Sequence, residues 1–266
     1  MTDVLEAIDI RQRFDNGGAA VEVLAGVSLR VGAGEFVSLL GPSGSGKSTL
    51  FQIIGGLLQP SGGEIRMGGE VVTGDRGRIA YMPQQASLLP WLTVAGNIEL
   101  ALEVAGTARA EARRLAHEWL ERIELAAYAD RYPHVLSGGM QQRVSFLRAL
   151  LMPRPLMCLD EPFGALDALT RMQMQQWLLQ LWEQSRRAVL LITHSIEEAL
   201  LLSDRIVVIS AAPAVVLHEL EVPFARPRDE TLWTDPQFNR LKQQIYGLLR
   251  QDDEPGPPPL RAGGER

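Results

Sequence analysis

The chain has 266 residues, of which 46% are hydrophobic and 22% are charged, enough apolar material for the core of one large domain. Its net charge of −6 argues against a nucleic-acid-binding protein, which would usually carry a basic face. The single cysteine, Cys158, lies in an apolar run, so we expect it to be buried and to form no disulfide within the chain.

Membrane insertion and secretion are not predicted either. No apolar run approaches the roughly 18 residues that a membrane-spanning helix needs. The first residues lack a basic region followed by an apolar one, the pattern of a secretory signal. We therefore expect a soluble, cytoplasmic protein that would serve a membrane only by docking on a separate partner.

Short β-rich segments alternate with longer helix-period segments, which predicts an α/β fold with a largely parallel sheet. The first thirty-odd residues and the stretch around 62–81 differ, because short strand-like pieces broken by glycine turns are typical of an antiparallel layer. Buried strands are predicted at 36–40, 156–159, 189–193 and 206–209. A first helix is predicted at 50–58, ended by Pro60. Two more are predicted from their apolar faces, one made by Leu115, Trp119 and Ile123 and the other by Met174, Leu178, Leu181 and Trp182. A last helix is predicted to start at Asp235-Pro236, with an apolar face made by Phe238, Leu241, Ile245 and Leu248.

The segment that follows the strand at 36–40 matches the pattern G-x-x-x-x-G-K-[ST] in full and precedes a helix. Glycines let the backbone curl closely enough for several N–H groups to face a triphosphate. In such a loop Lys47 brings positive charge to the β- and γ-phosphates of ATP, and Ser48 offers its hydroxyl to Mg²⁺. The sequence therefore predicts a nucleotide-binding loop made of Gly41, Pro42, Ser43, Gly44, Ser45, Gly46, Lys47, Ser48 and Thr49.

Two adjacent acids, Asp160 and Glu161, follow the strand at 156–159. A metal–phosphate site needs an anionic partner for Mg²⁺ and a group that orients the attacking water. We expect Asp160 to hold Mg²⁺ through its water shell and Glu161 to act as the general base or water-positioning group. Many strands end in solvated acids, so the pair alone is a weak indication of a metal site. Together with the upstream phosphate loop it becomes a strong one.

The segment 136–143, Leu-Ser-Gly-Gly-Met-Gln-Gln-Arg, resembles the signature motif of ABC ATPases and stands between the phosphate loop and the acidic pair, as in that family. Ser-Gly-Gly before a helix is a second anion nest, which a single ATP does not need from the same chain. The resemblance implies that two copies of the chain sandwich two ATPs, each between one phosphate loop and the other chain's signature motif. The residues implied to act in trans are Ser137, Gly138, Gly139, Gln141 and, in a segment that resembles the D-loop, Asp167.

The resemblance runs from about residue 4 to 210 and assigns three further positions. Phe14 lies where the family usually has an aromatic that stacks on adenine, with an ordinary strand core residue as the alternative. Gln84, with Gln85 as the alternative register, resembles the Q-loop glutamine that contacts Mg²⁺ and senses the membrane partner. His194 follows a strand beyond the acidic pair and resembles the switch histidine that contacts the γ-phosphate.

The segments 88–94, 163–167 and 194–199 look most like those of importer ATPases for nitrate, sulfonate and taurine. This resemblance implies a peripheral ATPase subunit at the cytoplasmic face of the inner membrane, bound to two transmembrane permease subunits. An extracytoplasmic solute-binding protein would be an indirect partner, and nucleic acid would not be one. Trp91 is expected near the groove that receives the permease's coupling helix.

Three other functions stay open. An exporter or lipoprotein-release ATPase is the same enzyme on a different membrane partner. A DNA-maintenance ATPase is disfavoured, because Lys47 and Ser137 are 90 positions apart with no sustained heptads between them, and the chain is acidic. A binding-only regulatory module is disfavoured by the presence of both Glu161 and His194.

The expected architecture is a P-loop NTPase core of the ABC type with an antiparallel β layer and a helical subdomain. We place the nucleotide-binding domain at 4–225, with the helical subdomain at about 88–152. A C-terminal helical appendage follows at 226–251. The last segment, 252–266, consists of Pro, Gly and charged residues with almost nothing to bury, and we expect it to be a disordered tail.

Overall fold

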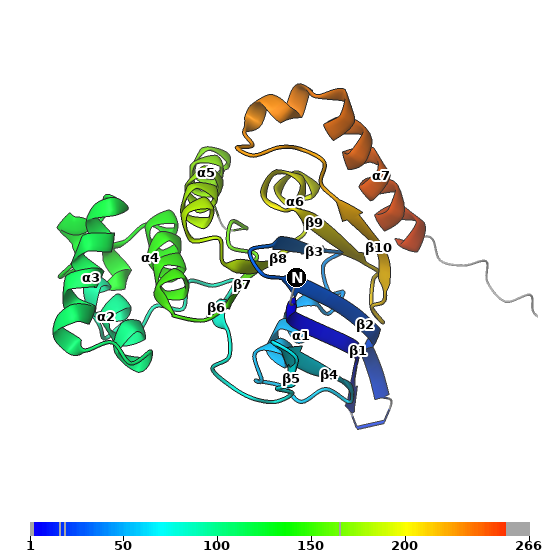
Figure 1. The fold of residues 1–266 in the computed structure, drawn as a ribbon, viewed down its shortest axis with the longest axis horizontal. Coiled ribbons are helices and arrows are strands. Elements are labelled where there is room, and N and C mark those ends of the chain that lie inside the picture. The colour runs from blue at the N-terminus through cyan, green and yellow to red at the C-terminus, as the bar shows by residue number, and fades with distance from the viewer. Residues whose placement is uncertain (1–2, 16, 19, 165, 254–266) are drawn as a thin grey trace, which may run out of the picture.

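The computed structural model describes residues 3–15, 17–18, 20–164 and 166–253. Its main element is a six-stranded sheet in the order β10-β9-β3-β8-β7-β6 (Figure 1). The strands from β9 to β6 are parallel to their neighbours, and β10 pairs antiparallel with β9 at one edge. The bounds are β3 (Phe36–Leu40), β6 (Ala80–Met82), β7 (Leu156–Asp160), β8 (Ala188–Thr193), β9 (Arg205–Ile209) and β10 (Val216–Glu221). The predicted α/β class is confirmed.

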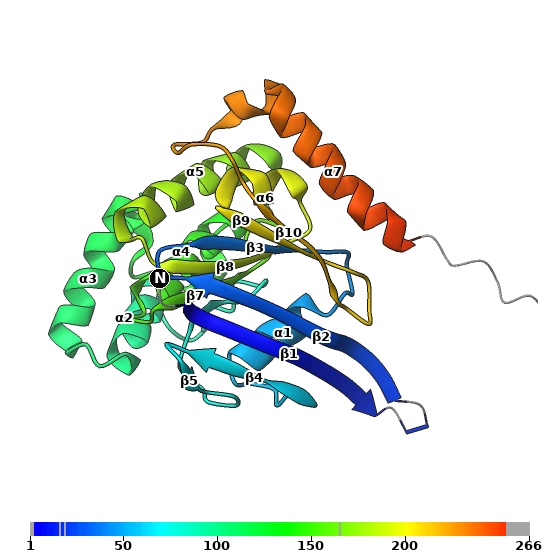
Figure 2. The same cartoon turned by 45° about the vertical axis from the view of Figure 1, so that its right-hand side comes forward.

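A second sheet lies against the first and is antiparallel, in the order β2-β1-β4-β5 (Figure 2). Its strands are β1 (Asp3–Asp15), β2 (Ala20–Gly32), β4 (Gly62–Met67) and β5 (Glu70–Val71). The predicted antiparallel layer is therefore confirmed up to β5. It is wrong for the end of the stretch 62–81, because Ala80 and Met82 are buried in β6, which pairs parallel with β7 in the other sheet.

Helix α1 (Lys47–Ile54) packs between the two sheets. Leu50 and Phe51 share an apolar core with Val27 of β2 and Leu190 of β8. Cys158 belongs to the same core and is fully buried, as predicted, and this burial raises the pKa of its thiol. The loop that precedes α1 is thus fixed by a helix whose apolar residues are buried in this core.

The helix predicted at 50–58 ends earlier than expected, at Ile54, and this part of the prediction is wrong. Gly56 has φ of +70°, and a Cβ there would collide with the carbonyl group of Asp75. Leu57 is 56% exposed and therefore does not extend the helix's buried face. The chain needs a glycine for this turn, which brings the 75–76 loop against the end of α1.

Four helices share one apolar core at the side of the parallel sheet, and the first two of them lie farther from the sheet than the third (Figure 1). They are α2 (Val94–Val104), α3 (Arg109–Arg122), α4 (Gly138–Leu151) and α5 (Ala168–Ser185), with short 3₁₀ turns at Ala126–Tyr128 and Pro133–Val135. The predicted helix around 115–123 is present, but its buried face is centred on Ala112, Ala116 and Leu120. Leu115 and Trp119 are only partly buried at the side of that face.

The C-terminal segment packs on α6 (Ile196–Leu202) through a 3₁₀ turn, η3 (Glu230–Thr234), and a long helix, α7 (Pro236–Asp253). Asp235 accepts hydrogen bonds from the backbone N–H of Gln237 at 2.6 Å and of Phe238 at 3.2 Å, so the predicted helix start is confirmed. Phe238 and Ile245 are buried against α6 and β9. The helix includes the first two residues of the predicted tail, and 254–266 lie outside the described residues.

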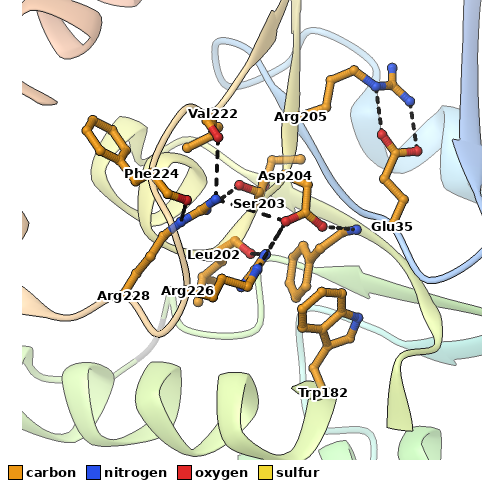
Figure 3. A network of polar contacts seen from close by, with 12 residues as sticks. Glu35, Trp182, Leu202, Ser203, Asp204, Arg205, Val222, Phe224, Arg226 and Arg228 are labelled. Atoms are coloured by element: carbon orange, nitrogen blue, oxygen red, sulfur yellow. Dashed lines mark hydrogen bonds and ion pairs between the residues drawn. The ribbon is translucent and has the colours of Figure 1, made fainter. Parts of the chain in front are cut away.

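Two arginines between β10 and η3 bind the end of α6 (Figure 3). Arg226 donates to the Leu202 carbonyl at 2.6 Å and to the Asp204 carboxylate, and its guanidinium lies 4.3 Å from the centre of the Trp182 ring. Arg228, only 5% exposed, donates to the carbonyls of Leu200 and Ser203. Burial lowers the pKa of Arg228 to about 10, so it stays charged at neutral pH. The carbonyls that a helix end leaves without helical partners are satisfied here by cations, which also suit the negative end of the helix dipole.

We predict that Arg228→Met destabilises the protein by about 1–3 kcal/mol, the usual cost of leaving buried carbonyl groups unpaired. The thermal unfolding midpoint should fall by several degrees for a chain of this size. Arg240→Met, an equal change at an exposed position of α7, should leave the midpoint within about one degree. Equal midpoints for the two variants would contradict this role of Arg228.

Candidate nucleotide-binding site

The glycine-rich loop connects the end of β3 to the start of α1 and borders a cavity of about 480 Å³. Gly46 has φ of +89°, and a Cβ there would lie 2.7 Å from a methyl group of Val23 in β2. The loop therefore needs glycine at this position for both its backbone conformation and the close packing against β2. The cavity is lined by Val23, Ser43, Gly44, Ser45, Gly46, Lys47, Ser48, Thr49, Gln84 and Glu161.

Lys47 points back into the loop that precedes it. Its ammonium group donates to the carbonyl of Gly41 at 2.8 Å and to that of Pro42 at 2.6 Å, with the Ser45 hydroxyl at 3.3 Å. The residue is 6% exposed, and this burial lowers its pKa, while the charges of Glu161 and Asp160 oppose that change. The loop thus holds one nearly buried positive charge at the floor of the cavity, where it can attract a phosphate.

Asp160 lies at the end of β7 and faces two hydroxyl groups. The Ser48 hydroxyl is 3.5 Å from one carboxylate oxygen, and the Tyr81 hydroxyl is 3.3 Å from the other. Burial raises the pKa of Asp160, and the hydrogen bonds from Ser48 and Tyr81 oppose this shift. The pKa of Tyr81 is itself raised by burial and by the charge of Asp160, so the phenol stays protonated and donates.

The residues around Asp160 fit a Mg²⁺ ion that is shared with phosphates. Ser48 and Asp160 offer adjacent oxygen atoms, the ligand type that Mg²⁺ prefers. Among the described residues there is no cluster of three or more His, Cys, Asp or Glu side chains that could hold a metal by themselves. A divalent cation here would therefore take most of its ligands from phosphate groups and water, as Mg²⁺ commonly does.

Glu161 lies between two polar side chains from neighbouring strand ends. The Gln84 amide donates to one carboxylate oxygen at 3.1 Å, and the His194 Nδ1 lies 3.4 Å from the other. Glu161 has φ of +43°, unusual for a residue other than glycine, and its backbone N–H donates to the Ile192 carbonyl in β8. The contact to Glu161 comes from Gln84 and not from the neighbouring Gln85.

Sequence reasoning missed Tyr81 and Gln142. Gln142, in α4, is buried and donates to the backbone carbonyl of Gln84 at 3.1 Å, which ties the signature helix to the loop after β6. The register of β6 against β7 pairs Tyr81 with Cys158, two residues before Asp160. The signal for Tyr81 was its position in a short apolar segment three residues before Gln84.

The five residues predicted to act in trans lie away from this cavity's lining. The Ser137 hydroxyl accepts from the Met140 N–H at 3.3 Å, and the Asp167 carboxylate accepts from the Thr170 N–H at 3.1 Å. Each side chain caps a helix, α4 or α5. Gly139 lies against Thr170, so the two helix starts are close together, and neither of them lines the cavity.

Gln141, one of these five residues, and Phe14 each have clear partners in the structure. Gln141 donates its amide to the carbonyls of Pro133 and Leu136, which holds the turn before α4. Phe14, on β1, is 38% exposed and pairs with Val21 of β2. Phe14 is therefore not buried in the core, and it does not line the cavity, so its contact with adenine stays a prediction.

Known proteins resemble this chain over most of its length. A family model described as ABC transporter matches residues 24–164. A taurine import ATP-binding protein from Chromobacterium violaceum is 44% identical over 86% of this chain and 89% of the relative. A nitrate import ATP-binding protein from Synechococcus elongatus is 42% identical over 93% of this chain and 38% of the relative. A solved dimeric ATP-binding cassette in a post-hydrolysis state with ADP and Pi is 33% identical and matches 83% of this chain and all of its own, with a TM-score of 0.73.

The chain therefore belongs to the ABC transporter family, as one of its ATP-binding cassettes. The predicted class, an ATPase of the ABC type, is confirmed.

We predict that Lys47→Ala weakens ATP binding about tenfold or more, because it removes the positive charge that attracts the phosphates at the cavity floor. Titration with a fluorescent ATP analogue checks this. The chain has one other lysine, Lys242 in α7, and Lys242→Ala makes the same change of charge outside the cavity. An unchanged affinity in Lys47→Ala, or an equal loss in both variants, would refute the role of Lys47.

Proposed function

We propose that the chain is the ATP-hydrolysing subunit of an importer for small solutes of the nitrate, sulfonate or taurine kind. The names of the similar taurine and nitrate import proteins support this choice of solute class. The observation that carries the ATPase mechanism is the Glu161 carboxylate, which is held between Gln84 and His194 at the border of the Lys47 cavity.

In this mechanism the phosphates of ATP lie in the loop 41–49, where backbone N–H groups and Lys47 bind them. Ser48, Asp160 and the amide oxygen of Gln84 would hold Mg²⁺, which neutralises charge on the β- and γ-phosphates when it is bound. The exposed ring of Phe14 stacks on the adenine.

Glu161 accepts a hydrogen bond from the attacking water and orients it toward the γ-phosphate. Its two neighbours fix the carboxylate, because the Gln84 amide and the His194 Nδ1 lie on different oxygens. With Nδ1 on the Glu161 side, the other ring nitrogen of His194 is left for the γ-phosphate. Hydrolysis and phosphate release then remove the contacts that close the site.

A second copy of the chain completes each site in this proposal. Ser137, Gly138, Gly139, Gln141 and Asp167 of one copy face the ATP held by the other. Their position outside their own cavity supports this arrangement, as does the dimeric form of the similar solved cassette. Binding of ATP closes the dimer, and release of the products reopens it.

The proposed membrane partner is a pair of permease subunits. A solute-binding protein outside the membrane would deliver the solute to them. None of the described helices is long and apolar enough to cross a bilayer. A groove of about 390 Å³ runs between the loop after β6 and helix α2, lined by Tyr81, Pro83, Leu100, Val104 and Arg148 among others. We assign this groove to the permease, because Val104 is 72% exposed and Tyr81 also touches Asp160. Trp91, 69% exposed, does not line the groove, so it would contact the permease only at its margin.

Each part of the chain has a proposed role. We propose that 4–225 forms the nucleotide-binding unit, that its helical part at about 88–152 carries the permease contact, and that 226–251 is a packing appendage. We place the chain at the cytoplasmic face of the inner membrane.

The segment between Lys47 and Ser137 contains α2 and α3, of 11 and 14 residues, in place of the long coiled coil of DNA-maintenance ATPases.

We predict that Glu161→Gln lowers steady-state phosphate release at least a hundredfold and leaves ATP affinity within about threefold, because the amide keeps the shape but cannot take a proton. The control is Glu70→Gln at an exposed position of β5, which should retain full turnover. Undiminished turnover in Glu161→Gln would overturn the assignment of Glu161, and no turnover in the wild type would favour a binding-only module.

A further inference from the structure

A buried carboxylate lies in helix α6, four residues after His194, and has no part in the mechanism above. Glu198, in the first turn of α6, is 8% exposed. One of its oxygens accepts from the Thr193 hydroxyl at 2.6 Å, and the other accepts from the Gln175 amide of α5 at 3.1 Å. Burial raises the pKa of Glu198, against these hydrogen bonds and the positive charge of Arg171. Keeping such a group buried is costly unless its partners are well placed.

Glu198 is hydrogen-bonded to the residues before and after His194, which form a turn. The Thr193 hydroxyl, which donates to Glu198, also accepts from the Ser195 N–H at 3.0 Å. The Ser195 hydroxyl in turn accepts from the Glu198 N–H at 3.2 Å. The residues on both sides of His194 are therefore bonded to Glu198, through one side chain and one backbone group.

His194 itself depends on this turn for its position. Its side chain is 56% exposed, and its contact with Glu161, at 3.4 Å, is looser than the bonds within the turn. Few packing contacts can hold so exposed an imidazole, so the direction of its Cα–Cβ bond is set by the backbone at 193–195. A small rotation of this turn would move the ring away from Glu161.

Helix α6 is also held at its far end. Arg226 and Arg228 donate to the carbonyls of Leu200, Leu202 and Ser203, and Figure 3 shows both guanidinium groups directed at this end of the helix. Near its start, Glu197 forms an ion pair with Lys242 of α7 at 2.5 Å. The helix therefore gives Glu198 a rigid base, and Gln175 connects the carboxylate to α5, the helix capped by Asp167.

We propose that Glu198 is a positioning residue for His194: through the Thr193 hydroxyl it fixes the turn 193–195, so that the imidazole faces Glu161 and the γ-phosphate. Glu198 does not line the nucleotide cavity and acts only through this turn. The inference rests on the proposed role of His194 in ATP hydrolysis.

The first test is the position of the imidazole, which needs no turnover. The chain has four histidines, so ring signals in a ¹H–¹³C NMR spectrum are few, and His194→Ala identifies the signal of His194. Thr193→Val keeps the shape of a buried side chain but removes the hydroxyl, and it should shift or broaden the His194 signal while His117, His134 and His218 stay unchanged. Thr193→Ser keeps the hydroxyl and should leave all four signals in place. An unchanged His194 signal in folded Thr193→Val would overturn the proposal.

The second test is kinetic. Glu198→Ala and Thr193→Val should lower kcat for ATP about tenfold with KM within about twofold, because the phosphate loop is untouched. Glu198→Gln can still accept from Thr193 and should keep most of the turnover. A KM that rises as far as kcat falls, or an unchanged kcat beside a shifted His194 signal, would overturn a positioning role. If the wild type does not hydrolyse ATP, the proposed function fails, and the His194 signal of Glu198→Ala, recorded in the same way as that of Thr193→Val, still decides whether Glu198 fixes the turn.

Discussion

The parallel pairing of β3, β8, β7 and β6 is the constraint on which the site depends. Parallel strands end at the same edge of a sheet, so the residues that follow them meet there. The phosphate loop follows β3, Asp160 ends β7, and His194 follows β8. Gln84 comes two residues after β6, and its amide reaches Glu161. A shift in the register of one strand would separate side chains that lie 3.1–3.5 Å apart.

The charges at the same edge suit a triphosphate that binds together with a divalent cation. Lys47 is nearly buried and satisfied by carbonyl groups and a hydroxyl, so it can stay in the loop without an ion pair of its own. Asp160 and Glu161 lie close enough to favour its charged form. Two carboxylates beside one lysine leave a net negative edge, which a divalent cation would offset when a triphosphate binds. The chemistry of the loop and that of the acidic pair are therefore complementary.

Local patterns in the sequence predicted the parts of the site that depend on short spacings. The phosphate loop, the acidic pair and the capped start of α7 each depend on a few consecutive residues, and the structure has them in the predicted secondary-structure context. The end of α1 was mispredicted, because the turn at Gly56 packs against the loop at Asp75, which lies farther along the chain. The place of β6 was mispredicted for a similar reason, since only its partner β7 makes it a parallel strand.

The side chains that sequence reasoning missed are those whose partners lie far along the chain. Tyr81 meets Asp160 across 79 positions, Gln142 meets Gln84 across 58, and Glu198 meets Gln175 across 23. No short motif marks such pairs, because each depends on how sheets and helices pack. The contact of Thr193 with Glu198 spans only 5 positions. A Thr before a His does not predict such a contact by itself, because the contact depends on how the chain turns at the end of β8.

In the proposed dimer each ATP lies between the phosphate loop of one copy and residues 137–141 and 167 of the other. The most direct measurement is the mass of the Glu161→Gln variant by light scattering, with and without ATP and Mg²⁺. We expect 29.3 kDa without nucleotide and twice that mass with ATP and Mg²⁺, with no doubling when Lys47→Ala is added. A mass that stays at 29.3 kDa with saturating ATP and Mg²⁺, beside a wild-type chain that hydrolyses ATP at the same rate per chain at every concentration, would contradict it.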